Sequence, residues 1–198
     1  MGEEIVEGGY DEIAEECLKS KNEDTLIFAK KLEEHLKPGS KILDAGCGPG
    51  VPIAKYLARN FQVYGIDISA KQVEFARKLV PGAEFKKADM LDPGFENETF
   101  DGIICLYALI HVDRTKHLEI LKRFYNLLKT PGYLLVCMQL EEWEGENEYL
   151  GTKLFWSGYG QKQNLELLKK SGFQIIWQKD WANPRDSNDR HLFVLCKK

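Results

Sequence analysis

No stretch of the 198-residue sequence approaches the ~20 consecutive apolar residues that a membrane-spanning helix requires. The first residues, Met1-Gly2-Glu3-Glu4, also lack the basic and apolar regions of a signal peptide. Positive charge is not in surplus either, because 27 Lys and Arg accompany 31 Asp and Glu, a net charge of −4. A general nucleic-acid binder needs the opposite balance for its phosphate contacts. The sequence therefore predicts a cytoplasmic protein with no membrane and no nucleic-acid partner.

Patterns of metal ligands are missing as well. The five cysteines are widely spaced without a C-x-x-C pair, and the four histidines form no H-E-x-x-H pattern. Cysteines spaced in this way usually remain free thiols in a reducing compartment and behave as small, buried apolar residues. We therefore expect neither disulfides nor a metal site.

Glycine, in contrast, is concentrated at one place that organises the rest of the chain. Gly46, Gly48 and Gly50 follow the apolar run Lys41–Ala45 and precede a helical pattern. Glycine adopts φ > 0 readily and lets a ligand approach the main chain closely. The pattern predicts a buried strand, a tight turn and a helix N-terminus beside a ligand.

The details of this turn distinguish between ligands. In the dinucleotide fingerprint G-x-G-x-x-G a pyrophosphate binds at the helix N-terminus. Here the third glycine comes one residue early, Val51 stands where the fingerprint has glycine, and no P-loop lysine follows. Asp44 lies two residues before the first glycine, where a carboxylate suits a cation better than a phosphate. The turn predicts a nucleoside ligand with positive charge and no phosphate.

A second carboxylate supports a nucleoside. Asp67 ends the predicted strand Gln62–Ile66 and lies 21 residues after Gly46. A spacing of ~20 residues is usual for a carboxylate that holds ribose hydroxyls. Nicotinamide enzymes and S-adenosylmethionine (SAM) enzymes share this spacing, so both remain open here.

The remaining chain alternates between strand and helix patterns. Residues 1–40 predict two amphipathic helices, and the last two strands form an antiparallel pair joined by a loop over Lys179–Arg190. Leu140–Gly160 is irregular, acidic and aromatic, which predicts a lid or binding loop. The other predicted strands are Ala83–Lys87, Phe100–Leu106, Tyr133–Gln139, Phe173–Gln178 and His191–Lys197, and the predicted helices are Val51–Arg59, Arg114–Leu128 and Gln161–Ser171.

The stretch Ile42–Gly50 resembles the first motif of the class I SAM-dependent methyltransferases. The segment Ala108-Leu-Ile-His-Val112, the turn Lys129–Gly132 and the aromatic run Phe155–Tyr159 are similar to segments of small members of that family. The resemblance implies a three-layer, Rossmann-like α/β sandwich with N-terminal helices. Its seven-stranded, mostly parallel sheet would have the order 3-2-1-4-5-7-6 with the last strand antiparallel.

The resemblance also implies one domain over residues 1–198. It divides into a helical cap (1–40), a cofactor-binding core (41–139) and a part with the lid loop, last helix and terminal strand pair (140–198). The implied cofactor is SAM, and S-adenosylhomocysteine is its product. By resemblance, the cofactor-binding residues are Tyr10, Asp44, Ala45, Gly46, Cys47, Gly48, Gly50, Asp67, Ile68, Ala88, Asp89, Met90, Leu106 and Tyr107.

The predicted reaction is an in-line methyl transfer to a small-molecule acceptor, with amines favoured by the acidic run. His111 is the candidate base if the acceptor must lose a proton, although it could equally pack beside the following helix. His111, Trp143, Trp156 and Tyr159 are the candidate acceptor-binding residues. Two other functions stay open, an NAD-dependent oxidoreductase and a non-catalytic SAM-binding partner subunit.

Overall fold

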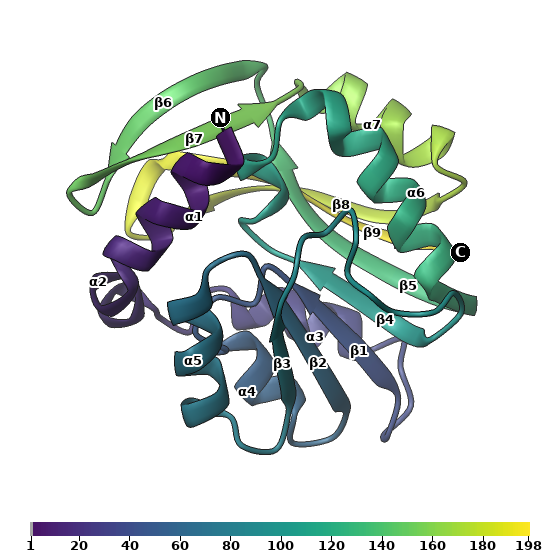
Figure 1. Cartoon of the computed structure of the whole chain (residues 1–198). Coiled ribbons are helices and arrows are strands. Elements are labelled where there is room, and N and C mark those ends of the chain that lie inside the picture. Colours follow the sequence, from purple (N-terminus) through teal and green to yellow (C-terminus); the bar gives the residue numbers. More distant parts are fainter. Residues whose placement is uncertain (1) are drawn as a thin grey trace.

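The centre of the molecule is one seven-stranded sheet, seen in Figure 1 in a computed structural model that describes residues 2–198. Its order is β3-β2-β1-β4-β5-β9-β8, and only β9 runs antiparallel to its neighbours. Two strands of a separate hairpin precede β8 and β9 in the chain. When the seven sheet strands alone are numbered along the chain, the order is the predicted 3-2-1-4-5-7-6. The sheet strands are β1 (Lys41–Ala45), β2 (Gln62–Asp67), β3 (Glu84–Lys87), β4 (Phe100–Cys105), β5 (Leu128–Gln139), β8 (Gln174–Asn183) and β9 (Asp186–Lys197).

Helices cover both faces of the sheet and make it the middle of three layers. Helices α3, α4 and α5 pack on one face, and α6 and α7 pack on the other. Two further helices, α1 and α2, lie beside the hairpin rather than on the sheet (Figure 1). The helices are α1 (Gly2–Glu12), α2 (Ala14–Ser20), α3 (Leu26–Glu33), α4 (Ile53–Leu57), α5 (Ala70–Leu79), α6 (His117–Leu127) and α7 (Gln161–Lys170).

Strand β5 shows why the central strands read as continuous apolar runs. Leu134 and Val136 pack into the layer of α6 and α7, whereas Leu135 and Cys137 pack into the layer of α3 to α5. Successive side chains of a strand point to opposite faces, so a strand covered on both faces must be apolar at every position. Each such burial stabilises the fold by about 1.5–3 kcal/mol.

The predicted lid loop at Leu140–Gly160 is wrong. This segment forms a hairpin of β6 (Trp143–Tyr149) and β7 (Thr152–Gly158). The two-residue turn has φ of 52° at Leu150 and 89° at Gly151, the left-handed pair that matches the twist of a tight hairpin. Glutamates alternate with other residues along β6, so the acidic run already had the period of a strand.

Several other predicted boundaries also differ, and β5, for example, begins at Leu128 rather than at Tyr133. The N-terminal segment forms three helices instead of two, and Met1 lies outside the described residues. The predicted loop Lys179–Arg190 is mostly strand, because β8 continues to Asn183 and β9 begins at Asp186. The long hairpin therefore extends beyond the sheet core to the edge where the parallel strands end.

Candidate functional site

A cavity of about 590 Å³ opens at the carboxyl ends of β1, β2 and β4. In open α/β sheets this edge, at the point where the strand order reverses, is where ligands bind. Most predicted site residues line the cavity: Tyr10, Asp44, Gly46, Cys47, Gly48, Asp67, Ile68, Ala88, Asp89, Met90, Leu106, Tyr107, His111 and Trp156.

The glycine turn between β1 and α4 needs glycine for two separate reasons. Gly46 has a φ of +81°, and a Cβ built on it would lie 2.1 Å from Cβ of Ala108. Met90 closes the same space, since its Cε would lie 3.2 Å from that added atom. A side chain here would therefore require both a strained backbone and displacement of the segment after β4.

Asp67 is held rigidly at the end of β2. Its Oδ2 accepts a hydrogen bond from the Gly48 N–H at 2.8 Å, and its Oδ1 accepts one from the Ser69 N–H at 2.9 Å. Ser69 caps α5 by accepting from the Gln72 N–H at 3.1 Å. Burial raises the pKa of Asp67 while the two backbone hydrogen bonds lower it. The carboxylate is thus fixed beside the glycine turn, where its remaining lone pairs can accept hydrogen bonds from the hydroxyl groups of a ligand.

Asp44 is the charged group that most needs a ligand. Its side chain is 4% exposed, and its Oδ2 has no hydrogen-bond partner. Burial, and then the nearby charge of Asp67, raise the pKa of Asp44 to about 7. A buried carboxylate without a partner is costly, and a bound cation would remove that cost. The chain's residues therefore fit a cofactor that carries positive charge.

Tyr10 and His111 meet above the cavity, although 101 positions separate them. The Tyr10 hydroxyl lies 2.9 Å from Nε2 of His111, and Nδ1 of His111 lies 2.8 Å from the carbonyl oxygen of Phe155. Since a carbonyl only accepts, Nδ1 carries the proton and Nε2 accepts from the tyrosine hydroxyl. Burial lowers the pKa of His111 to about 4, so the ring is neutral near pH 7.

Helix α1 brings Tyr10 to this place by docking on two elements. Gly9 lets the helix approach β7, because a Cβ there would lie 2.5 Å from Cδ2 of Leu154. On its other side, Asp11 accepts hydrogen bonds from the Ser69 hydroxyl at 2.5 Å and the Lys71 N–H at 3.1 Å. The helix therefore connects the hairpin to the start of α5 and covers the cavity.

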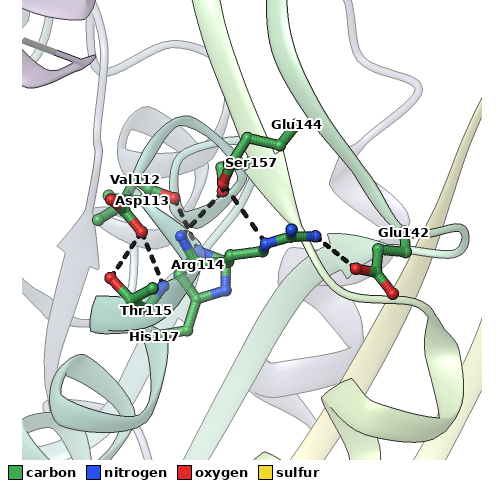
Figure 2. A network of polar contacts seen from close by, with 8 residues as sticks. All are labelled: Val112, Asp113, Arg114, Thr115, His117, Glu142, Glu144 and Ser157. Atoms are coloured by element: carbon green, nitrogen blue, oxygen red, sulfur yellow. Dashed lines mark hydrogen bonds and ion pairs between the residues drawn. The ribbon is translucent and has the colours of Figure 1, made fainter.

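Arg114 fastens the hairpin to the segment after β4, as Figure 2 shows. This segment has two single turns, η1 (Leu109–His111) and η2 (Arg114–Lys116). The Arg114 guanidinium donates to Glu142 at 2.7 Å and lies 3.4 Å from Glu144. The Ser157 hydroxyl accepts from the Arg114 N–H at 2.9 Å and donates to Glu144 at 2.6 Å. Ser157 lies two residues from Phe155 on β7, so this network holds the carbonyl that fixes the His111 ring.

We expect Ser157→Ala to lower the free energy of unfolding by about 1–3 kcal/mol. The Ser157 side chain is fully buried, and without its hydroxyl the backbone N–H of Arg114 loses its hydrogen-bond acceptor. Urea denaturation measures this change. Glu142→Gln is the matched control, since its side chain is 59% exposed and such ion pairs contribute about 0–1 kcal/mol. Equal effects of the two substitutions would show that Ser157 does not anchor the hairpin.

Four predicted site residues do not line the cavity. Ala45 is buried in the core on the α6 side, and Gly50 packs with its Cα side toward Ala76 and Val80 of the α5 region. Trp143 is 40% exposed on the outer hairpin strand. Tyr159 packs against the core, and the guanidinium carbon of Arg114 lies over its ring, 5.3 Å from the ring centroid. For these four, spacing along the chain predicted nearness to the turn or lid but not the direction of the side chain.

Two groups of cavity residues were missed by sequence reasoning. One is the segment after α2, and the other is the tip of the β8–β9 hairpin, which the sequence analysis predicted as a loop without assigning it to the site. The hairpin tip lies far along the chain from the glycine turn. The missed residues include Ser20, Lys21, Asn22, Asp24, Thr25, Trp181, Asn183, Arg185, Asp186, Asp189 and His191.

The chain is similar to known methyltransferases. The model of a methyltransferase domain family matches residues 42–132. Phosphoethanolamine N-methyltransferase 3 of Arabidopsis thaliana is 37% identical over 120 residues, covering 58% of this chain and 24% of the relative. Cycloartenol-C-24-methyltransferase 1 of Oryza sativa subsp. japonica is 30% identical over 191 residues, covering 81% and 53%. The chain thus spans only about a quarter to a half of these relatives.

A solved structure has the same fold. The 1,6-didemethyltoxoflavin-N1-methyltransferase of Burkholderia thailandensis, with bound 1,6-didemethyltoxoflavin and S-adenosylhomocysteine, aligns with a TM-score of 0.76 at 17% identity, covering 96% of this chain and 84% of that chain. Residues 42–132 thus match a methyltransferase domain family, and the chain is similar in sequence and fold to class I, Rossmann-like SAM-dependent methyltransferases.

Two features are absent from residues 2–198. None of the described helices is both long and apolar enough to span a membrane. Within the same residues, no three His, Cys, Asp or Glu side chains gather in a way that could hold a metal ion.

Proposed function

We propose that this chain methylates a small amine, with SAM as the methyl donor. The observation that carries the proposal is the cavity itself, whose lining combines Asp44, with no hydrogen-bond partner for its Oδ2, and the aromatic residues Tyr107, Tyr149 and Trp156. Aromatic faces attract ammonium groups. Similar proteins include N-methyltransferases, which agrees with an amine acceptor.

The acidic run, however, gives no support to this preference. Glu142 and Glu144 bind Arg114 on the outside of the hairpin, and the glutamates of 141–148 do not line the cavity. The preference for an amine therefore rests on the aromatic residues and on the acids within the cavity.

Several residues of the cavity would each bind a different part of SAM. When bound, SAM supplies an electrophilic methyl group on a positively charged sulfur. Asp44 would balance positive charge, Asp67 would accept ribose hydroxyls, and Asp89 with Met90 would contact the adenine. Each of these side chains lines the cavity, and Asp89 is held by the Leu91 N–H at 2.8 Å. Exclusion of water and alignment of the acceptor would supply much of the rate.

Tyr10 and His111 would position the acceptor. Because the Tyr10 hydroxyl donates to His111, its oxygen keeps lone pairs that can accept an N–H of the acceptor amine. His111 itself has both ring nitrogens engaged, so its geometry favours a positioning role over that of a base. We also propose a cytoplasmic location, which is supported by five free cysteines, all buried.

Calorimetry with SAM and S-adenosylhomocysteine, followed by labelled-methyl transfer to a panel of amines that includes phosphoethanolamine, tests the proposed function. Micromolar binding with turnover on at least one amine is the expected result. Binding without turnover on the panel would favour a non-catalytic subunit. Absence of SAM binding would contradict the proposal entirely.

His111→Ala should lower turnover about 100-fold while SAM affinity changes less than threefold, because Tyr10 loses the group that orients it. Tyr10→Phe, which keeps the ring and removes the hydroxyl, should have a similar effect on turnover. Steady-state kinetics and calorimetry separate the two quantities. Unchanged turnover, or a large loss of SAM affinity in His111→Ala, would contradict the positioning role.

A further inference from the structure

The tip of the β8–β9 hairpin contributes an acid and an imidazole, Asp189 and His191, to the cavity. Neither has a role in the mechanism proposed above. Trp181 and His191 face each other across the two strands, and both line the cavity. Asp189 lies two residues before His191 on β9 and also lines it. Strand side chains alternate, so this spacing places the acid and the imidazole on one face.

Asp189 lies within ion-pair distance of His191, although the pair does not have hydrogen-bond geometry. Nδ1 of His191 lies 3.0 Å from Oδ1 of Asp189, while Oδ2 of Asp189 accepts from the Asn183 amide at 2.8 Å. These contacts, first that with His191, lower the pKa of Asp189, which is therefore ionised near neutral pH. A carboxylate beside Nδ1 favours the proton on that nitrogen and leaves Nε2 as the acceptor.

An aromatic ring packs against the imidazole of His191. The ring of Tyr107 meets that of His191 edge to face, with centroids 5.1 Å apart. Tyr107 has a φ of 55°, a backbone conformation that non-glycine residues rarely adopt and that is often found at functional sites. The hairpin tip is also tied to the segment before α3, because Arg185 donates to Asp24 at 2.8 Å. His191 therefore lies beside Tyr107 in a hairpin tip that is anchored to the segment before α3, on the side of the cavity formed by β9 rather than by β2 and Asp67.

A methyl acceptor of the proposed class needs such a group. An amine is mostly an ammonium ion near pH 7, and its nitrogen has no free lone pair until one proton leaves. His111 is a poor recipient, because a carbonyl and a tyrosine hydroxyl occupy its nitrogens. Of the two histidines that line the cavity, only His191 is backed by a carboxylate.

We propose that His191, oriented by Asp189, is the catalytic base that takes the proton from the acceptor amine. The inference rests on the proposed function. The N–H proton moves to Nε2, and the freed lone pair forms the bond to the methyl carbon. The electron pair of the methyl–sulfur bond goes to sulfur, and the imidazolium then releases its proton to solvent. Charge and atoms balance without a further reactant.

One experiment tests the state of His191 without any acceptor. Diethyl pyrocarbonate acylates a free, neutral imidazole nitrogen, and mass spectrometry locates the product. In the full chain, we expect His191 to be modified before His111. Modification of His111 while His191 stays intact would overturn the proposal.

The second experiment uses turnover on an amine that the wild-type chain methylates. We expect His191→Gln to lower kcat at least 100-fold and Asp189→Asn about tenfold, with S-adenosylhomocysteine affinity within threefold of wild type. His35→Gln is the matched control, because His35 packs on Tyr133 and does not line the cavity. Its kcat should not change.

The outcomes separate the two proposals. A wild-type chain that methylates an amine equally well after His191→Gln overturns the role of His191 and leaves the proposed function standing. A wild-type chain that binds S-adenosylhomocysteine but methylates no amine overturns the proposed function, and the role of His191 with it. Retained cofactor affinity in each variant shows that the fold is intact.

Discussion

Gly46→Ala should reduce the affinity for S-adenosylhomocysteine at least 100-fold, equivalent to about 2.7 kcal/mol. Gly46 combines a φ of +81° with a predicted Cβ contact of 2.1 Å to Ala108, far inside the ~3.5–4 Å of ordinary carbon contacts. The turn or the segment after β4 must therefore move. Because Gly48 of the same turn donates to Asp67, such a movement also displaces the carboxylate proposed to hold the ribose. Calorimetry measures the loss.

The chain offers controls that separate strain from collision. Gly39 has nearly the same φ, +83°, but a Cβ there meets nothing within 4 Å. Gly39→Ala should therefore lower the free energy of unfolding by about 1–2 kcal/mol without changing cofactor affinity. Gly82, with open space and no positive φ, should tolerate alanine at no loss. Gly46→Ala binding the cofactor as well as Gly39→Ala does would show that the turn does not form the cradle.

The glycine turn and its acids could be predicted because their signals are local. A strand end, alternate glycines and an acid 21 residues later specify backbone conformation and edge position within a short segment. The family resemblance added the sheet order. Both levels agree with the structure, since β1, β2 and β4 bring Asp44, Asp67 and Leu106 to one cavity.

The far wall of the cavity could not be predicted in the same way. His191 joins the cavity only because β9 returns antiparallel beside β5, and because β8 and β9 extend beyond the core. The hairpin β6–β7 was missed for a related reason. Its outer strand is charged, so the apolar alternation that indicates a half-buried strand is weak. On its inner strand, Leu154 is the one apolar side chain that is fully buried.

Asp44→Asn should have opposite effects on cofactor affinity and on the stability of the cofactor-free chain. The wild-type carboxylate is buried, with its pKa raised to about 7 from 3.8. A group that binds its proton more tightly when folded stabilises the fold below its unfolded pKa, and that stability is lost as pH rises through the folded pKa. The wild-type chain therefore loses stability between about pH 4 and pH 7, by on the order of 4 kcal/mol for this group.

Other groups titrate in this window, so the difference between wild type and Asp44→Asn is the quantity to measure. His111 acts with the opposite sign, because its pKa is lowered to about 4 and an unfolded chain binds its proton more tightly. Asp67, with a raised pKa, acts with the same sign as Asp44. Both contributions are present in both proteins and largely cancel in the difference. Urea denaturation at pH 5, 6, 7 and 8 should show Asp44→Asn gaining on wild type as pH rises.

SAM binding should follow the reverse course, since the ionised carboxylate is the form that pairs with a cation. Wild-type affinity should rise about tenfold from pH 6 to pH 8 as Asp44 loses its proton. Asp44→Asn should bind about 10–100-fold more weakly at pH 8 and show little dependence on pH, because a charge-assisted contact of about 1.5–3 kcal/mol is lost. Equal pH dependence in the two proteins would mean that Asp44 does not face the cation. A variant that is more stable at pH 8 yet binds SAM more weakly would show that the buried charge is kept for its ligand rather than for the fold.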